Sequence, residues 1–454
     1  MTVTRNGPVV AAAAGEVVER LRADRVEWAT CVWVDLGGRP KGKLIALDRL
    51  AAAAAGGDLY TPRGLAWLGR SDAAEPEGYT VPDLARAVQL PTDPTIAWIP
   101  SDVHQSGRPF PHCTRSVLRR QIARATDLGY RVQVGIECEV YLLKETPDGL
   151  VPFASSSDIE PTPLYDIRGV MEDLPVMRPM AAAMERLGWG LEAFDQECGR
   201  GQVEFDFGYT DALGMADRLV LFRFLLAEYA RRAGAVACFM PKPFSDSWGS
   251  GAHINLSLAD TEVGRNLFED PEDPRGMGFS RLAYGSVAGL MAHAGAVVAL
   301  SAPTVNSYKR LVPQGALPDI SWAPTVVAYG DNNRSCMLRL PRSRRCLENR
   351  TPDISCNPYL AIAIHVAAAL DGIVRGLDPG EPCREDTFQS GGAGYRRLPR
   401  NLLEAIEALE ADPLAGEVLG PELSRDYVAA KRREWNEFHT EVFEWERRRY
   451  LSAF

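Results

Sequence analysis

The sequence predicts an α+β protein that contains more than one domain. Its 454 residues exceed a single typical domain, and 46% of them are hydrophobic, so the chain can bury a large core. Strand-like and helix-like segments alternate irregularly from about residue 130 to 365, and the last part of the chain is helical in pattern. A proline-rich connector, HQSGRPFPHCTR at 104–115, places a domain boundary near residue 107.

The first predicted element is a helix within residues 1–24. Arg5 and the apolar run PVVAAAAG that follows it could also begin a signal peptide. That run leads directly into EVVERLRADRVEW, whose charged amphipathic pattern favours the helix of a cytoplasmic protein. No apolar run is long enough to span a membrane.

The elements that follow are marked by their turn residues. ATCVWVDLGGRPKGKLIAL, from Ala29, is typical of two strands around a glycine-rich turn. SVLRRQIARATDLGY predicts a helix that ends at Gly129, and a strand from Val132 to Leu142 follows it. The C-terminal part predicts helices at 357–376, 401–412 and 426–451.

The strand from Val132 to Leu142 has one apolar and one polar face. Its even positions are all apolar, whereas its odd positions include Glu137 and Glu139. Residues two apart in a strand point the same way, so the two glutamates share the face opposite the core. For this strand alone, a solvated outer face would explain the charges.

The same alternation recurs in other segments. Their polar positions are Gln202, Glu204, Asp206, His253, Asn255, Ser257, Glu348 and Arg350. Lysine is absent from these faces, which instead carry several carboxylates and one imidazole. These are ligand groups that hard divalent cations use. Together the segments predict a cleft that binds Mg²⁺ or Mn²⁺. No Cys–His pattern favours zinc.

Arginines form a second pattern, in NSYKRLVP, GDNNRSCMLRLP and PRSRRCLENR. Guanidinium groups bind phosphates and carboxylates bidentately, and some of these arginines will simply lie on the surface. Beside a metal cluster, they suggest phosphoryl transfer from a nucleotide to an anionic acceptor. Neither a P-loop nor a dinucleotide-binding fingerprint is present in the sequence.

Composition argues against some partners and compartments. The formal net charge is −10 and no basic block stands out, which disfavours nucleic acid as a partner. The nine cysteines are scattered without C-x-x-C pairs. Such an odd, unpatterned set suits a reducing cytoplasm better than a disulfide framework.

Seven blocks of the sequence, in their order along the chain, resemble the signature motifs of the glutamine synthetase superfamily. They are DLGGRPKGK, GIECEVYLL, DQECGRGQVEF, GSGAHINLS, PTVNSYKRLVP, NNRSCMLRLP and LENRTPDISCNPYLA. The resemblance implies a small N-terminal β-grasp domain at 25–107. It also implies a large catalytic domain at 108–454, whose curved, funnel-like antiparallel sheet is flanked by helices.

The resemblance also implies an assembly and a reaction. Family members form double rings, usually dodecamers, and each active site lies between neighbouring subunits. ATP phosphorylates the γ-carboxylate of glutamate, and an amine nitrogen then displaces the phosphate. Two to three Mg²⁺ or Mn²⁺ ions would be bound in each site.

Site residues carry over from the matching motifs. The ligands of the metal nearer glutamate would be Glu139, Glu197 and Glu204, and those of the metal nearer the ATP phosphates Glu137, His253 and Glu348. Glutamate would be bound by Gly249, His253, Arg310 and Arg350, and the nucleotide by Asn255, Ser257, Arg334 and Arg339. Asp35 would reach the adjacent subunit's site and bind the attacking nitrogen, and Arg310 and Arg334 would stabilise the transferred phosphoryl group.

Three positions depart from the ammonia-using members of the family. Ala316, in QGALP, stands where those members have a glutamate that closes over the site. Asn255 replaces a second histidine, and Ser343 replaces a lysine near the phosphates. The missing carboxylate leaves Asp35 as the remaining candidate at the nitrogen site, and it makes room for a substituted amine.

Several details are more similar to γ-glutamylmethylamide synthetases and the related third-type glutamine synthetases, among them FMPKPF and SWAPTVVAYGDNNR. We therefore expect a ligase that makes a γ-glutamyl amide from glutamate and a small amine such as methylamine. The alternatives are an ammonia-dependent glutamine synthetase, a ligase for a larger amine, polyamine or different acid, and a non-catalytic relative. Retention of all six metal-ligand positions argues against the last.

Overall fold

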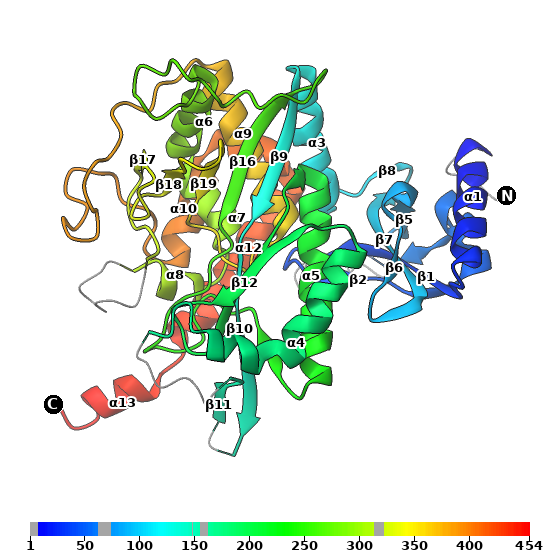
Figure 1. Ribbon diagram of the computed structural model, residues 1–454, viewed down its shortest axis with the longest axis horizontal. Coiled ribbons are helices and arrows are strands. Elements are labelled where there is room, and N and C mark those ends of the chain that lie inside the picture. Colours follow the sequence, from blue (N-terminus) through cyan, green and yellow to red (C-terminus); the bar gives the residue numbers. More distant parts are fainter. Residues whose placement is uncertain (1–7, 62–73, 148, 155–161, 313–321) are drawn as a thin grey trace.

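The computed structural model describes residues 8–61, 74–147, 149–154, 162–312 and 322–454. Figure 1 shows the strands of the first hundred residues as a separate sheet beside the larger part of the chain. Ala316 and the rest of the predicted lid segment from 313 to 321 lie outside the described residues.

The N-terminal sheet is mixed. Its strands among the described residues are β1 (Trp28–Val34), β2 (Pro40–Lys41), β3 (Leu44–Ala46), β4 (Leu59–Tyr60), β5 (Gly78–Pro82), β6 (Val88–Leu90), β7 (Asp93–Gln105) and β8 (Arg108–Pro109). β1 pairs in parallel with β7, and the other pairs are antiparallel. This mixed order is compatible with a β-grasp domain, and the boundary near residue 107 stays a prediction.

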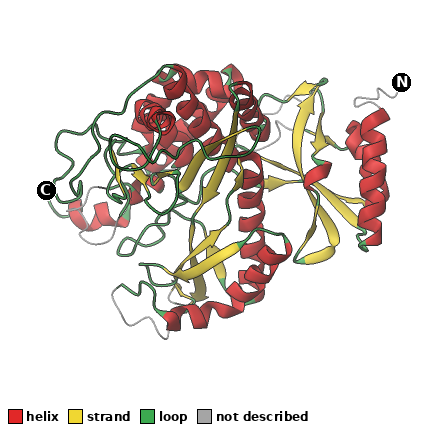
Figure 2. Ribbon diagram, turned by 45° about the horizontal axis from the view of Figure 1, so that its top comes forward, coloured by secondary structure: helices red, strands yellow, loops and turns green. Residues whose placement is uncertain are grey.

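A helix covers one face of this first sheet. α1 (Pro8–Ala23) packs Val18 and Leu21 against Ala29 and Ile99 of the central strands. Short helical turns, α2 (Leu50–Ala52) among them, lie between β3 and β4. Figure 2 shows α1 on the outer side of the sheet, away from the larger part of the molecule. The unit therefore has a core of its own.

The larger part contains strands that form two further sheets. One has the order β11 (Gly149–Pro152), β10 (Cys138–Thr146), β13 (Gln202–Phe207) and β12 (Leu191–Gln196), with β15 (Val236–Cys238) also on β10. The other has the order β14 (Thr210–Asp211), β9 (Tyr130–Ile136), β16 (Ile254–Asp260), β19 (Leu347–Asn349), β18 (Leu338–Leu340) and β17 (Tyr329–Asp331). Apart from the parallel pair β17 and β18, neighbouring strands are antiparallel. Together they form the curled sheet that the family resemblance implied.

The strand predicted from Val132 to Leu142 is divided at Glu137. β9 pairs Ile136 with Ile254 in one sheet, whereas β10 pairs Cys138 with Phe205 in the other. The chain thus passes from one sheet to the next at Glu137, whose backbone N–H donates to His253 O at 3.2 Å. The apolar even positions are buried, as the alternation predicted.

The larger part also contains helices, most of which cover the side of its sheets that faces the core. They are α3 (Thr114–Asp127), α4 (Ile167–Arg186), α5 (Ala212–Arg232), α6 (Arg281–Ala292), α7 (Ala294–Ser301), α8 (Ser307–Arg310), α9 (Pro358–Val374), α10 (Leu402–Ala411), α11 (Pro413–Leu419), α12 (Pro421–Thr440) and α13 (Glu444–Tyr450). α6 and α9 cross closely, because Gly289 and Gly372 lie at the crossing: a Cβ on Gly289 would be 2.0 Å from Ala368 O. Within the described ranges no single helix is long and apolar enough to cross a membrane; only the pair α6 and α7, bent by 76°, reaches that length together.

The helix predicted over 426–451 is interrupted. α12 ends at Thr440 and α13 begins at Glu444, so the three residues between them break the helix. α13 extends away from the rest of the molecule (Figure 1), and Trp445 and Leu451 are exposed.

Candidate active site

The concave side of the two sheets contains a cavity of about 470 Å³. Its wall includes carboxylates from β10, β12 and β13 and arginines from the chain between α8 and β19. Of the predicted site residues, those in this wall are Glu137, Glu139, Glu197, Glu204, Gly249, His253, Arg310, Arg334, Arg339 and Arg350. Within the described residues, six of the seven family-like segments therefore converge on one cavity, and DLGGRPKGK does not.

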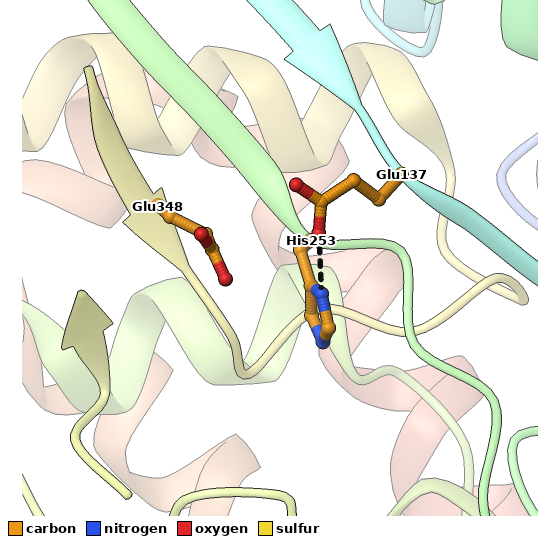
Figure 3. Close-up of side chains that lie close together, drawn as sticks. All are labelled: Glu137, His253 and Glu348. Carbon is orange, nitrogen blue, oxygen red and sulfur yellow. Dashed lines mark hydrogen bonds and ion pairs between the residues drawn. The ribbon is translucent and has the colours of Figure 1, made fainter. Parts of the chain in front are cut away.

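Glu137, His253 and Glu348 form one candidate metal group. Each offers an oxygen or nitrogen ligand atom, and these atoms lie within 4.8 Å of one another. The side chains come from the β9–β10 junction, the residue before β16, and β19 (Figure 3). His253 Nδ1 is 2.8 Å from Glu137 Oε2, which aims the imidazole at the carboxylate.

Glu139, Glu197 and Glu204 form a second candidate metal group, again with ligand atoms within 4.8 Å of one another. Glu139 and Glu204 are directly opposite each other on β10 and β13, and Asp195 of β12 is opposite Glu204. Gly251 N–H donates to Glu139 Oε2 at 2.7 Å. Like charges directly opposite each other destabilise a sheet, and a cation held by Glu139, Glu197 and Glu204 would offset that cost.

The electrostatics of the second group confirm that the carboxylates repel one another. Burial and the charge of Glu139 raise the pKa of Glu197 to about 7. Burial, followed by the charges of Glu139 and Glu137, raises the pKa of Glu204 well above its ordinary value. A divalent cation would relieve this repulsion, and an all-carboxylate donor set suits Mg²⁺ or Mn²⁺.

The pKa of Glu137, in contrast, is lowered. Burial raises its pKa, but the hydrogen bond with His253 and the charges of His253 and Arg344 outweigh burial and lower it. This carboxylate is therefore ionised near neutral pH. The carboxylates and imidazole of the two groups thus fit the hard divalent metals that the sequence predicted.

Three arginines surround Glu348. Arg339 donates to Glu348 Oε2 at 2.7 Å, Arg350 donates to Oε1 at 2.5 Å, and Arg344 donates to Oε2 at 3.3 Å. Glu348 is fully buried, so these partners neutralise a charge that would otherwise be costly to bury. The same guanidinium groups line the cavity, where they can also contact a phosphate.

Arg310 is fixed by the backbone. Its two guanidinium nitrogens donate to Thr351 O and Arg350 O, each at 3.0 Å. Gly249 lies against it: a Cβ on Gly249 would be 2.7 Å from Arg310 Cγ. Only glycine therefore leaves the arginine stem in place.

A second cavity, of about 620 Å³, adjoins the first. The predicted nucleotide ligands Asn255 and Ser257 line it, whereas Arg334 and Arg339 line the first cavity. Glu137, Asp206 and Arg344 line both. Glu137 therefore brings the first candidate metal group to the junction of the two cavities, where a phosphate could pass from one ligand to the other.

Asp35 lies apart from both cavities. It is buried in the turn between β1 and β2, where its Oδ1 accepts from Arg39 N–H at 2.9 Å and Lys41 Nζ is 3.5 Å from Oδ2. Asn357 Nδ2 donates to Asp35 O at 2.9 Å. Within the described part of this subunit, Asp35 does not line the cavity that holds the candidate metal ligands.

Several residues that had no predicted role also line the first cavity. They are Leu164, Tyr165, Asp195, Asp206, Trp248, Trp322 and Arg344. Asp206 lies on the polar face of an alternating segment, and Arg344 lies in an arginine-rich segment. The sequence therefore carried a signal for both. Asp195 lies in β12, a segment for which no strand was predicted, and the two tryptophans lie in irregular segments with no periodicity to mark them.

Comparisons with known proteins place the chain in a family. Residues 111–450 match the family model described as "Glutamine synthetase, catalytic domain". A glutamate–methylamine ligase of Methyloversatilis universalis is 36% identical over 444 residues, which cover 97% of this chain and 99% of that protein. A glutamine synthetase of Rhizobium leguminosarum bv. phaseoli is 35% identical over 431 residues, covering 94% and 97%.

Solved structures agree with these relatives. A GmaS complex with ADP has a TM-score of 0.89 and 36% identity, and it covers 96% of this chain and 99% of that one. GmaS without ligand has a TM-score of 0.87 at the same identity. The family match and these relatives identify the chain as a carbon–nitrogen ligase. The chain belongs to the glutamine synthetase family, whose members depend on ATP and divalent metal.

Proposed function

We propose that this enzyme uses ATP to join the γ-carboxylate of glutamate to a small primary alkylamine, with methylamine the best candidate. The observation that carries the proposal is the pair of candidate metal groups in one cavity, with Glu137 in one and Glu139 in the other. The relative that acts on methylamine supports the choice of amine.

The two groups divide the cavity between the substrates. Glu137 lines both cavities, and we assign its group, with His253 and Glu348, to a Mg²⁺ or Mn²⁺ ion that would contact the ATP phosphates. Glu139, Glu197 and Glu204 line the first cavity and not the second, and we assign them to one or two ions that would lie beside glutamate. Bound metal neutralises phosphate and carboxylate charge, which lowers the barrier to phosphoryl transfer.

The chain's own residues bind and orient the substrates. Arg310 and Arg350 would hold glutamate, with the Gly249 backbone lining its pocket, and Asn255 and Ser257 would contact the nucleotide. Arg334 and Arg339 would stabilise the γ-phosphate as it moves. Because guanidinium groups stay charged, they serve throughout both steps.

The reaction has two steps. A γ-carboxylate oxygen of glutamate attacks the terminal phosphorus of ATP, so that ADP leaves and γ-glutamyl phosphate forms. The amine nitrogen then attacks the acyl carbon, the C–O bond to phosphate breaks, and the nitrogen loses a proton. A carboxylate near the nitrogen is needed for this loss, and we propose Asp35 of a neighbouring subunit for it.

The role of Asp35 implies an assembly in which subunits complete one another's sites. We propose a homo-oligomer, a dodecamer of two hexameric rings as in the family. Support comes from Asp35, which lies outside the cavity of its own subunit. The nine free cysteines support a reducing compartment such as the cytoplasm.

ATP-dependent phosphate release tests the function. The purified enzyme would be assayed with glutamate and a panel of ammonia, methylamine, ethylamine, ethanolamine, putrescine, isopropylamine and aniline. Methylamine is expected to give the highest kcat/KM; ammonia as clearly the best substrate would contradict the proposal. Asp35→Asn should lower amine turnover, and unchanged turnover would show that the nitrogen site is elsewhere.

A further inference from the structure

Two tryptophans form part of the wall of the first cavity, which is otherwise lined mainly by charged side chains. Trp248 lies in the loop before β16, and Trp322 lies in the irregular segment that precedes β17. Their rings meet edge to face, with centroids 5.9 Å apart and planes at 79°. Trp322 keeps 45% of its surface exposed, so the pair is not simply a piece of the hydrophobic core. Exposed indole faces beside carboxylates are suited to a ligand that is both apolar and positively charged.

The loop that carries Trp248 is held firmly. The buried Tyr141 hydroxyl donates to Trp248 O at 2.7 Å, and Gln202 Nε2 donates to Gly249 O at 3.0 Å. Gly249 packs against Arg310, which we assign to glutamate. The aromatic pair is therefore positioned next to the acid substrate rather than next to the nucleotide cavity.

A carboxylate outside both candidate metal groups faces the same cavity. Asp195 lines it, and Asp195 Oδ1 is buried with no hydrogen-bond partner in the part of the chain that the structure describes. A buried, unpartnered carboxylate oxygen is costly unless a ligand supplies a donor. An ammonium group has such donors and the matching charge.

We propose that Trp248 and Trp322 form the subsite for the alkyl group of the amine substrate, with Asp195 attracting its ammonium charge. The proposal rests on the proposed function and deepens it, because it names the residues that select a small alkylamine over ammonia. At neutral pH a small alkylamine is a cation with an apolar end. Tryptophan faces bind both parts, whereas ammonium offers them no alkyl surface.

The test compares amine selectivity in variants. Steady-state phosphate release would be measured with methylamine, ethylamine and ammonia for the wild type, Trp322→Ala, Trp322→Phe and Asp195→Asn. For Trp322→Ala the ratio of kcat/KM for methylamine to kcat/KM for ammonia should fall about tenfold, mainly through a higher KM for methylamine. Trp322→Phe should restore much of the ratio, because an aromatic face remains. Asp195→Asn should raise the KM for both amines and leave the KM for glutamate near its wild-type value.

Trp28→Ala provides a matched control. Trp28 is 44% exposed, a fraction similar to that of Trp322. It lies on β1 of the first sheet and does not line the cavity. Its selectivity ratio should equal that of the wild type. If the wild type prefers alkylamines and Trp322→Ala keeps the same preference, the subsite proposal is wrong and the proposed function stands. A wild type that prefers ammonia to every alkylamine would overturn the proposed function, and the subsite with it.

Discussion

Glu139 and Glu204 lie directly opposite each other on the adjacent antiparallel strands β10 and β13. The next strand continues the row, because Asp195 on β12 is opposite Glu204. Three carboxylates in register across three strands oppose the stability of the sheet that carries them. A cation held by Glu139 and Glu204 would offset their repulsion. Glu137, at the point where the chain changes sheets, belongs to the other candidate metal group, so the two glutamates that share a strand face in the sequence serve different sites.

Removing one charge of this row should stabilise the metal-free protein. In EDTA, Glu204→Gln should raise the melting temperature by roughly 2 °C or more, because a neutral side chain relieves the repulsion with Glu139. Mg²⁺ should then raise the melting temperature less than it does for the wild type. Differential scanning fluorimetry with and without Mg²⁺ measures both shifts. Glu145→Gln, at an exposed position of β10, is the control; equal behaviour of the two variants would contradict the account.

Metal binding should release protons near neutral pH. Burial and the charge of Glu139 raise the pKa of Glu197 to about 7, so below that pH the metal must displace a proton. The apparent Mg²⁺ affinity should therefore fall as pH drops through 7, by up to about tenfold per pH unit for one proton. Calorimetry at pH 6.5 in two buffers with different ionisation enthalpies measures the release. Identical heats in both buffers would rule it out.

The same shift affects the stability of the metal-free protein with a definite sign. A raised pKa means that the folded state keeps a proton that the unfolded state has already released. The ordinary pKa of a glutamate is 4.5, and that of Glu197 in the folded protein is about 7. The contribution of Glu197 to the free energy of unfolding should therefore decrease as pH rises from 4.5 to about 7. Urea titrations in EDTA across this range would detect the decrease.

Glu137→Ala and Glu139→Ala should give different kinetic defects. Glu137 lines both cavities, so its loss should mainly raise the KM for ATP, by about tenfold or more. Glu139 lines only the first and fixes the Gly251 backbone, so its loss should mainly raise the KM for glutamate. Steady-state titration of each substrate separates the effects. Indistinguishable profiles for the two variants would mean that the metals are not divided between the substrates.

Arg115 is expected to be a main contributor to the attachment of the first sheet to the rest of the chain. Its buried guanidinium lies 2.9 Å from Asp83, 3.2 Å from Asp102 and 2.9 Å from Asp217. Arg115→Met would leave buried carboxylates without their partner and should lower the free energy of unfolding by about 3–5 kcal/mol. Arg119→Met, whose side chain is 43% exposed, should cost about 1 kcal/mol or less. Chemical denaturation compares the two, and equal losses would show that Arg115 has no special role.

Local patterns in the sequence predicted much of the fold. Alternation identified the buried residues from Val132 onward, and Gly129 correctly marked the end of α3. Alternation does not show which strand will be the neighbour, so the change of sheet at Glu137 was not foreseen. The break between Thr440 and Glu444 was also missed, because the residues around it continue a helical pattern in a segment that makes few core contacts.

The candidate site was predicted where a motif or a period marked it. The candidate metal ligands were predicted from the resemblance of their motifs to the family. The structure brings them together in the two groups that were predicted. Trp248 and Trp322 could not be placed, because their edge-to-face contact joins segments over seventy residues apart in irregular structure. Arg344 carried only the general signal of an arginine-rich segment, and its position beside Glu137 and Glu348 depends on tertiary structure.

We propose above that the enzyme forms a γ-glutamyl alkylamide rather than glutamine. The direct measurement is a competition in one vessel, with glutamate, ATP, Mg²⁺ and equal concentrations of methylamine and ammonia, followed by mass spectrometry of the products. The account predicts that γ-glutamylmethylamide accumulates in clear excess over glutamine and that its formation requires ATP. Glutamine as the main product would contradict it.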